Sequence, residues 1–216
     1  GNPEPISYGL NSKLVKNEQG EVVEQVWKVG GMYSNAIEQI VYWLEKAATV
    51  ADDTQRATIE ALIAYYRTGD LKKFDEYNIL WVNDTDCNVD FVNGFIESYG
   101  DPLGRKASWE SVVNFRDVEA CKRTEIMAAN AQWFEDNAPI NPAYRKKEVK
   151  GVSAKDITVA MLGGDCYPAT AIGINLPNAD WIRKEHGSKS VTIDNITYAY
   201  AKAAELDVKG SKAKDI

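Results

Sequence analysis

Two short segments of the chain carry polar side chains whose types and spacing would allow them to act together in binding or catalysis. In the segment FIESYGDP, Glu97 and Tyr99 are two residues apart, so on a strand both side chains would project from one face. In the segment GINLPN, the amides of Asn175 and Asn178 flank a proline that fixes the local backbone. Taken alone, residues of these types serve turns and helix caps more often than binding sites, so both interpretations stay open.

The chain offers little for metal or nucleophilic chemistry. His186 is its one histidine, which excludes HExxH and two-histidine sites within these residues. It stands in a polar stretch, where a surface or C-capping role is expected rather than catalysis. Cys87, Cys121 and Cys166 are widely spaced and odd in number, which suits free, buried thiols and a reducing compartment rather than disulfides or a metal cluster. Gly163-Gly164-Asp165 lacks the spacing of a phosphate loop, so no cofactor is predicted within the chain.

Composition excludes other classes of function. The 216 residues contain 32 acidic and 25 basic side chains, a net charge of -7, without a basic stripe that could neutralise a nucleic-acid backbone. The densest basic run, Arg145-Lys146-Lys147, follows two prolines and is interpreted as a solvated connector rather than a docking patch. No apolar run approaches the length of a membrane-spanning helix. A globular protein without nucleic-acid or membrane partners is expected.

A helical period of apolar residues predicts two helices that pack as a hairpin. The first covers about residues 33–50, and the second runs from Thr54 to a stop at Gly69. The apolar face of the first helix repeats every three or four residues at Ile37, Ile40, Val41, Leu44 and Ala48. β-Branched and aromatic residues between Trp81 and Gly104 then predict a strand bounded by turns.

Two further helices are expected in the middle of the chain. A roughly helical period predicts one over residues 110–136, ended by two prolines. A capping-box-like pattern that begins at Ser153 predicts another, which would carry residues 157–162.

The last third is expected to contain a strand and two helices. Residues 171–176 should form the strand, and Pro177 places its end at a sheet edge because proline cannot donate to a ladder. Asn178 is the expected N-cap of a helix that begins at Ala179. A helix over residues 194–206 and a loose tail over residues 209–216 complete the prediction.

The segments FIESYGDP and GINLPN resemble the signature stretches of the dipeptidyl peptidase III family, zinc exopeptidases that remove dipeptides from peptide N-termini. The order and spacing follow that family over nearly the whole chain, and the likeness is strongest to bacterial members of the Bacteroides type. The matching positions are Ser7-Tyr8, Trp27-Lys28, Tyr33, residues 39–46, Trp81, residues 92–99, Asp101-Pro102 and residues 173–183.

The resemblance implies an α+β, helix-rich chain with a small β-barrel or sheet portion, as part of a two-lobed peptidase. Residues 1–109 and 151–216 would belong to the substrate-binding lobe, with residues 110–150 as a helical excursion towards the zinc lobe. The family's zinc motifs, HExxGH and EExxA(D/E), do not occur in the sequence. Zinc is therefore expected only in the full-length enzyme, and this piece is expected to be inactive and to need the zinc-binding lobe as its partner. A cytoplasmic location is favoured.

The family's residue roles fall on particular positions here. The anchors of the substrate's free amino group fall on Glu97, Asn175 and Asn178. The tyrosine that bonds the scissile peptide's backbone or oxyanion falls on Tyr99, and Arg183 matches a cleft arginine. The strand with Ile172, Gly173 and Ile174 matches the one on which an extended oligopeptide lies by strand addition. The rival hypothesis is a non-catalytic peptide-binding or scaffold module that kept this cleft.

Overall fold

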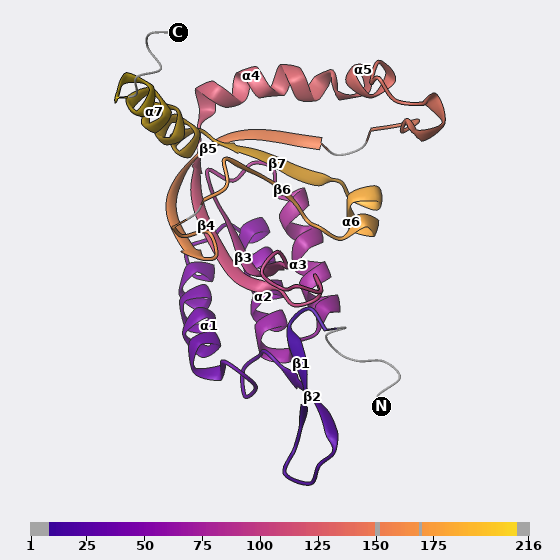
Figure 1. Ribbon diagram of the computed structural model, residues 1–216, viewed down its shortest axis with the longest axis vertical. Coiled ribbons are helices and arrows are strands. Elements are labelled where there is room, and N and C mark those ends of the chain that lie inside the picture. Colours follow the sequence, from indigo (N-terminus) through magenta and orange to yellow (C-terminus); the bar gives the residue numbers. More distant parts are fainter. Residues whose placement is uncertain (1–8, 150–151, 169, 211–216) are drawn as a thin grey trace. The chain divides into compact units, whose positions relative to one another are not determined.

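A computed structural model describes residues 9–149, 152–168 and 170–210 (Figure 1). The chain divides into two compact units. The first unit contains the residues up to Cys87 together with Gly94–Trp109 and Pro177–His186. The second contains Asn88–Asn93, Glu110–Leu176 and the residues from Gly187 onwards. The chain thus passes between the units several times.

The described residues of the first unit include a β-hairpin and four helices. Its strands are β1 (Ser12–Lys16) and β2 (Val22–Val26), and its helices are α1 (Ser34–Ala48), α2 (Asp53–Thr68), α3 (Leu71–Asn83) and α6 (Asp180–Glu185). The first two helices confirm the predicted hairpin. The Asp52 carboxylate caps α2 by accepting the N–H of Gln55 at 2.9 Å, and Gly69 ends the helix with a left-handed φ of 71°.

The core of the first unit is built from the predicted apolar faces and from a helix that the sequence patterns did not assign. Ile37, Val41 and Leu44 of α1 are buried against the adjacent α2. Helix α3 adds three buried aromatic residues at helical spacing, Phe74, Tyr77 and Trp81. Trp81, expected near the start of a strand, therefore lies in a helix.

The second unit contains most of a mixed sheet with the strand order β3-β4-β5-β7-β6, and strands β3 and β4 run on into the first unit. Its strands are β3 (Val89–Glu97), β4 (Ser108–Arg116), β5 (Val152–Gly164), β6 (Gly173–Leu176) and β7 (Ser188–Ile193). Strand β5 is antiparallel to β4 and parallel to β7, and β6 is antiparallel to β7. The helices are α4 (Val118–Ala129), α5 (Ala131–Asp136) and α7 (Asp194–Gly210), with a 3-10 turn at Pro142–Tyr144. The α+β class is confirmed, although the described strands form an open sheet rather than a closed barrel.

The helix predicted over residues 110–136 is wrong in its first part, where the chain forms β4. Glu110, Val112 and Asn114 are buried while their neighbours are more exposed, so burial repeats every second residue. The helix begins only at Val118, after Asp117 has accepted the N–H of Ala120 at 2.9 Å. Spacings of three and four cannot be told from alternation when apolar residues are this frequent.

The helix predicted to begin at Ser153 is wrong as well, because that segment is β5. Ile157 and Val159 are buried while Thr158 and Ala160 are exposed, which is the alternation of a strand. Strand β7 was not predicted.

The predictions for residues 171–206 fit the structure better. Strand β6 stands at one end of the sheet, as Pro177 indicated. Helix α6 is present, but Ala179 is its N-cap residue and makes no side-chain cap, so the capping role predicted for Asn178 is wrong. Helix α7 is confirmed and reaches Gly210, while residues 211–216 lie outside the described residues. No helix in the described ranges is long and apolar enough to cross a membrane.

Candidate functional site

Glu97 and Tyr99 lie where β3 ends. Glu97 is the last residue of the strand and is half-buried, whereas Tyr99 lies two residues further on, in a turn, with 92% of its surface exposed. The expectation that both project from one face of a strand is therefore wrong for Tyr99. Its orientation depends on the turn that follows β3.

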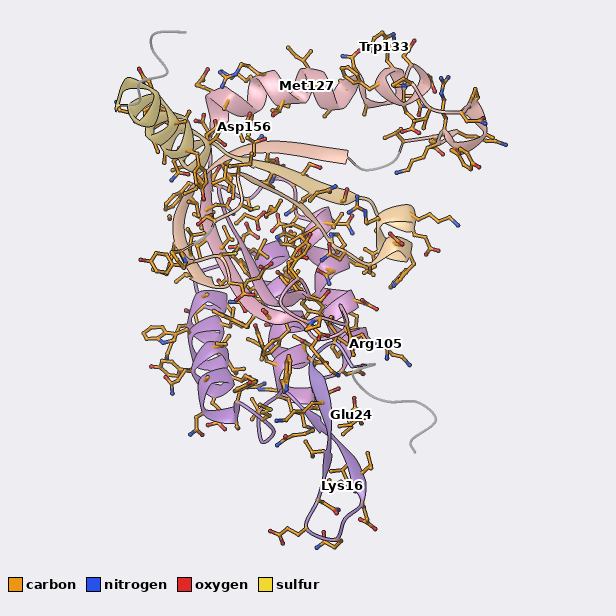
Figure 2. All side chains as sticks on the ribbon, in the orientation of Figure 1. Lys16, Glu24, Arg105, Met127, Trp133 and Asp156 are labelled. Atoms are coloured by element: carbon orange, nitrogen blue, oxygen red, sulfur yellow. The ribbon has the colours of Figure 1, made fainter. Side chains whose placement is uncertain are left out.

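Asp101 organises that turn. Its carboxylate accepts the backbone N–H groups of Arg105 and Lys106, both at 2.8 Å, and that of Leu103 at 3.3 Å. The N–H groups of Arg105 and Lys106 hold the pKa of the Asp101 carboxyl below its usual value, because they stabilise the charged form. Figure 2 labels Arg105, whose side chain is exposed on this turn. The charged form of Asp101 thus fixes the chain next to Tyr99.

The same turn is tied to the N-terminal part of the first unit. The Lys106 ammonium donates to the carbonyl of Gly9 at 2.6 Å, and the N–H of Ala107 donates to the carbonyl of Leu10 at 2.9 Å. These contacts join residues almost a hundred positions apart in sequence. The loop that carries Tyr99 is therefore anchored at its base.

Strand β6 presents an edge in the second unit. The carbonyl of Ile172 accepts the N–H of Ile193 at 2.9 Å, which makes Ile172 and Ile193 a hydrogen-bonded pair. Because such pairs alternate along antiparallel strands, the N–H and carbonyl of Gly173 are directed away from β7, towards the edge of the sheet. A Cβ on Gly173 would lie 2.8 Å from the carbonyl oxygen of Val191, so only glycine fits this close approach.

Asn175 lies on the exposed face of β6. Its side-chain oxygen accepts the hydroxyl of Ser190, the residue opposite on β7, at 3.3 Å. The next residue, Leu176, is buried.

The predicted site residues are distributed over both compact units. Glu97, Tyr99, Asn178 and Arg183 belong to the first, and the strand residues Ile172–Asn175 belong to the second. Within the first unit, Asn178 is exposed just before α6, and Arg183 is half-buried in α6.

The described residues do not fit a metal centre. In residues 9–149, 152–168 and 170–210, no three His, Cys, Asp or Glu side chains gather closely enough to hold an ion. His186 is the C-cap residue of α6, as one of the two interpretations proposed, and its ring packs edge-on against Trp181 at 6.0 Å. None of the three cysteines, all of which are described, forms a disulfide. Cys87 and Cys121 are buried, whereas Cys166 is half-buried, which corrects the expectation that all three are buried.

The first unit also contains an aromatic cavity of about 550 Å³ that no sequence pattern predicted. Trp27, Tyr33, Phe95 and Trp109 line it, and the rings of Trp27 and Phe95 are 5.0 Å apart. Tyr33 has a φ of 62°, uncommon for a residue with a side chain. That backbone conformation is visible only in the structure.

The second unit contains a buried ion pair between Asp90 and Lys189 that was not predicted from the sequence. One sequence signal could have indicated it, namely the charge of Lys189 at an inward position of an otherwise alternating stretch.

The chain is an α+β protein with a strand at the edge of its sheet, and proteins of this class can bind an extended peptide by strand addition. Comparison with known proteins identifies the family to which the chain belongs. Residues 9–215 match the model of peptidase family M49, and the chain belongs to that family.

Curated relatives extend well beyond this chain. Dipeptidyl peptidase 3 of Rattus norvegicus is 29% identical over 219 residues, which cover 100% of this chain and 29% of that protein. Dipeptidyl peptidase 3 of Homo sapiens is 29% identical over 207 residues, covering 95% of this chain and 27% of that protein. The chain thus spans less than a third of the length of these relatives.

Solved structures share the fold. Dipeptidyl-peptidase III from Corallococcus sp. strain EGB gives a TM-score of 0.76 at 23% identity, covering 90% of this chain and 36% of that one. DPP III from Caldithrix abyssi gives a TM-score of 0.79 at 22% identity, covering 91% of this chain and 37% of that one.

Proposed function

We propose that this chain is the substrate-positioning part of a dipeptidyl peptidase that removes dipeptides from the free N-termini of oligopeptides. The observation that carries the proposal is the family match over residues 9–215, together with the GINLPN segment at the edge of a sheet. Dipeptidyl peptidase activity is a property of the named relatives, and the edge strand supplies a surface on which a peptide can bind.

The first function proposed for the site is strand addition along Ile172–Asn175. The main-chain groups of Gly173 are directed to the edge of the sheet, where an extended peptide can form ladder hydrogen bonds. Such bonds recognise backbone rather than side chains. The substrate class that follows is therefore oligopeptides of broad sequence.

The second function is measurement of length from the N-terminus. A dipeptidyl peptidase must count two residues from a free ammonium, which calls for a fixed negative charge with flanking acceptors. We assign the charge to Glu97, and the flanking acceptors to the amide oxygens of Asn175 and Asn178. Amides suit this role because they accept N–H bonds without adding repulsion between carboxylates.

The third function is contact with the scissile peptide bond. The exposed hydroxyl of Tyr99 would donate to the carbonyl oxygen as negative charge develops on it. The turn ordered by Asp101 gives that hydroxyl a defined starting position. Arg183, half-buried in α6, is proposed as a further contact to the peptide.

Zinc belongs, in this proposal, to the complete enzyme. The described residues do not fit a zinc site. In the complete enzyme residues 1–109 and 151–216 would belong to the substrate-binding lobe, and residues 110–150 would extend towards the zinc lobe. The 216-residue chain alone should therefore release no dipeptide.

The proposal is tested in a complete M49 peptidase that contains this sequence. Glu97→Gln keeps the shape of the side chain but removes its charge. It should lower kcat/KM for free peptides by a factor that corresponds to about 1.5–3 kcal/mol of lost transition-state stabilisation. Acetylation of the peptide N-terminus should cause a similar loss, and the two losses should not add because they remove one interaction. The control is Glu18→Gln, an exposed glutamate between β1 and β2, which should change nothing.

One outcome would contradict the assignment of Glu97 as the ammonium anchor, and another would contradict the proposed peptidase activity. If the Glu97 variant discriminates between free and acetylated peptides as well as the wild type does, the ammonium anchor lies elsewhere. If the complete protein binds free peptides through Glu97 but releases no dipeptide, the rival function as a peptide-binding module holds.

A further inference from the structure

The first unit contains an uncharged aromatic cavity next to the strand that carries Glu97. Its volume is about 550 Å³, within the range of about 300–1,000 Å³ that is usual for ligand pockets. Trp27, Tyr33, Phe95 and Trp109 form its aromatic walls. None of the described side chains that line it carries a charge, and aromatic faces are negative, so an acidic group would lose its hydration there without gaining a partner. The cavity therefore suits a large apolar or aromatic group.

The walls of the cavity are restrained by contacts among themselves and with the core. The indole N–H of Trp109 donates to the hydroxyl of the buried Tyr66 at 2.8 Å, which restrains the indole ring. The centroid of the Trp27 ring lies 5.0 Å from that of Phe95 and 5.8 Å from that of Tyr33, which it meets edge-on. A preformed site of this kind loses little conformational entropy when a ligand binds.

Tyr33 is placed at the cavity by a strained loop between β2 and α1. Its φ of 62° is left-handed, a conformation that is uncommon for residues other than glycine. The N–H of Met32 donates to the carbonyl of Val26 at 3.1 Å, and a Cβ on Gly31 would overlap the same carbonyl oxygen, so only glycine fits beside it. Strain persists where the surrounding structure holds it, and it is frequent at sites that clamp a ligand.

Glu97 lies on the same face of β3 as a wall of the cavity. A Cβ on Gly94 would lie 2.9 Å from the Phe74 ring and 3.4 Å from Ile96, so Gly94 and Ile96 face helix α3. Side chains alternate along a strand, so Phe95 and Glu97 face the other way, where Phe95 lines the cavity. Their Cα atoms are about 7 Å apart, two steps along the strand. A group bound at the Glu97 carboxylate is therefore within reach of the cavity.

The turn that carries Tyr99 adjoins the cavity as well. Ser108, at the start of β4, lines the cavity, and its hydroxyl oxygen would lie 3.6 Å from a Cβ on Gly100, the residue after Tyr99. Phe95 thus lines the cavity and Gly100 lies against a residue that lines it. The two proposed contacts to the peptide, Glu97 and Tyr99, lie between these positions in the chain.

We propose that this aromatic cavity is a specificity pocket that receives the side chain of the peptide's first residue. It selects large apolar and aromatic side chains over small and acidic ones. The assignment to the first residue rests on the proposed function, because it takes the ammonium to be bound at Glu97, and that side chain leaves the same Cα atom as the ammonium. The second side chain of an extended peptide points the opposite way. Main-chain bonds accept any sequence, and pockets for individual side chains add the preference.

The cavity is tested first on the 216-residue chain, where no peptidase activity is needed. The probe is p-cresol, which models a tyrosine side chain, and binding is followed by NMR through the indole N–H signals of Trp27 and Trp109. Both signals should shift and saturate with one dissociation constant. Propionate, which models an acidic side chain, should shift neither.

Ala36→Phe fills the cavity from an exposed position on α1, so the variant should fold, and it should raise the dissociation constant of p-cresol about tenfold or more. Ala36→Leu carries the same expectation and replaces it if that variant fails to fold. The matched control is Ala47→Phe, at an exposed position of the same helix outside the cavity, and it should bind p-cresol as the wild type does. If p-cresol shifts neither indole signal, or binds the Ala36 variants as tightly as the wild type, the proposal is overturned.

Kinetics in a complete peptidase that contains this sequence test the selection. The peptides differ only in their first residue. Those that begin with tyrosine or leucine should be cleaved with a kcat/KM about 10- to 100-fold above those that begin with glycine, the factor expected for burying such a side chain. Ala36→Phe should remove most of this preference and leave kcat/KM for the glycine peptide unchanged, whereas Ala47→Phe should keep the preference. A merely structural defect would lower kcat/KM for all peptides alike.

Two results separate this proposal from the proposed function. If the preference survives in Ala36→Phe, another pocket receives the first side chain, and the specificity pocket is refuted while the peptidase function stands. If p-cresol binds as expected but the wild type cleaves acetylated peptides as well as free ones, the ammonium is not bound at Glu97. The cavity is then a binding site, and its assignment to the first residue is overturned.

Discussion

Replacing Gly173 by alanine tests the edge strand most sharply. The added Cβ would lie 2.8 Å from the carbonyl oxygen of Val191, whereas close carbon–oxygen contacts in sheets are about 3.3–3.6 Å. Strand β6 must therefore move away from β7 by about 0.5 Å or more. A shift of that size stretches the bond between Ile193 and Ile172, now 2.9 Å, beyond the usual range.

The expected magnitude follows from the hydrogen bonds that flank Gly173. Weakening two of them at about 0.5–1.5 kcal/mol each destabilises β6 by about 1–3 kcal/mol. Because β6 is a short strand at the end of the sheet, the loss should be local rather than global. Amide exchange of Ile174 and Leu176 should accelerate by roughly 5- to 150-fold.

The measurement is amide exchange by mass spectrometry or NMR on the chain, with Gly100→Ala as control. That control adds the same methyl group where the nearest atom is 3.6 Å away, so exchange in β6 should not change. In a complete peptidase the displaced strand should lower kcat/KM by about tenfold, since misplacement by 1 Å can cost about a hundredfold. Unchanged protection of β6 in Gly173→Ala would refute the close approach, and unchanged kcat/KM would refute strand addition.

Three further predictions concern single side chains. Tyr99→Phe in a complete peptidase should lower kcat about a hundredfold with little change in KM, and an unchanged kcat would exclude the hydroxyl from the reaction. Asp101→Asn should lower kcat/KM about 3- to 10-fold by loosening the turn, and acid should do the same to the wild type. Because the pKa of the Asp101 carboxyl is lowered, its contribution to the stability of the turn is present above the unfolded pKa of 3.8 and is lost as the pH falls through the folded pKa. Unchanged amide exchange in this turn at low pH would contradict this. Burial is the main reason, and the charge of Asp194 the second, why the pKa of the Asp156 carboxyl is raised; Figure 2 labels this residue. The ionised form of Asp156 therefore destabilises the fold as the pH rises through the folded pKa. Asp156→Asn should therefore raise Tm by about 2–4 °C at pH 7 and by nothing at pH 3, as thermal unfolding at the two pH values would show.

Local patterns predicted the elements whose signals are local. The stripe Ile37, Val41 and Leu44 lies on one helix, and Gly69 supplies the left-handed residue that ends the next one. Pro177 indicated a strand at the edge of a sheet, because a missing N–H is a property of the residue itself. The spacing of Glu97 and Tyr99 was equally visible, but the turn that orients Tyr99 was not.

The strands β4 and β5 could not be found in this way. Val112 pairs with Leu162, fifty residues further along the chain, and each segment alone has a composition compatible with a helix. Pairing between distant segments selected the strand, with burial repeating every second residue. Tertiary context thus overrode the local pattern in both places.

The sequence by itself determined the hairpin of α1 and α2, the α+β class and the resemblance to a peptidase family, because these depend on residue type and short spacing. Only the tertiary structure decided that Gly173 lies against the Val191 carbonyl, and that Lys189 meets Asp90 across 99 positions of sequence. The physical reason is that register and ion pairing are properties of two segments brought together. No pattern within either segment records where the other will lie.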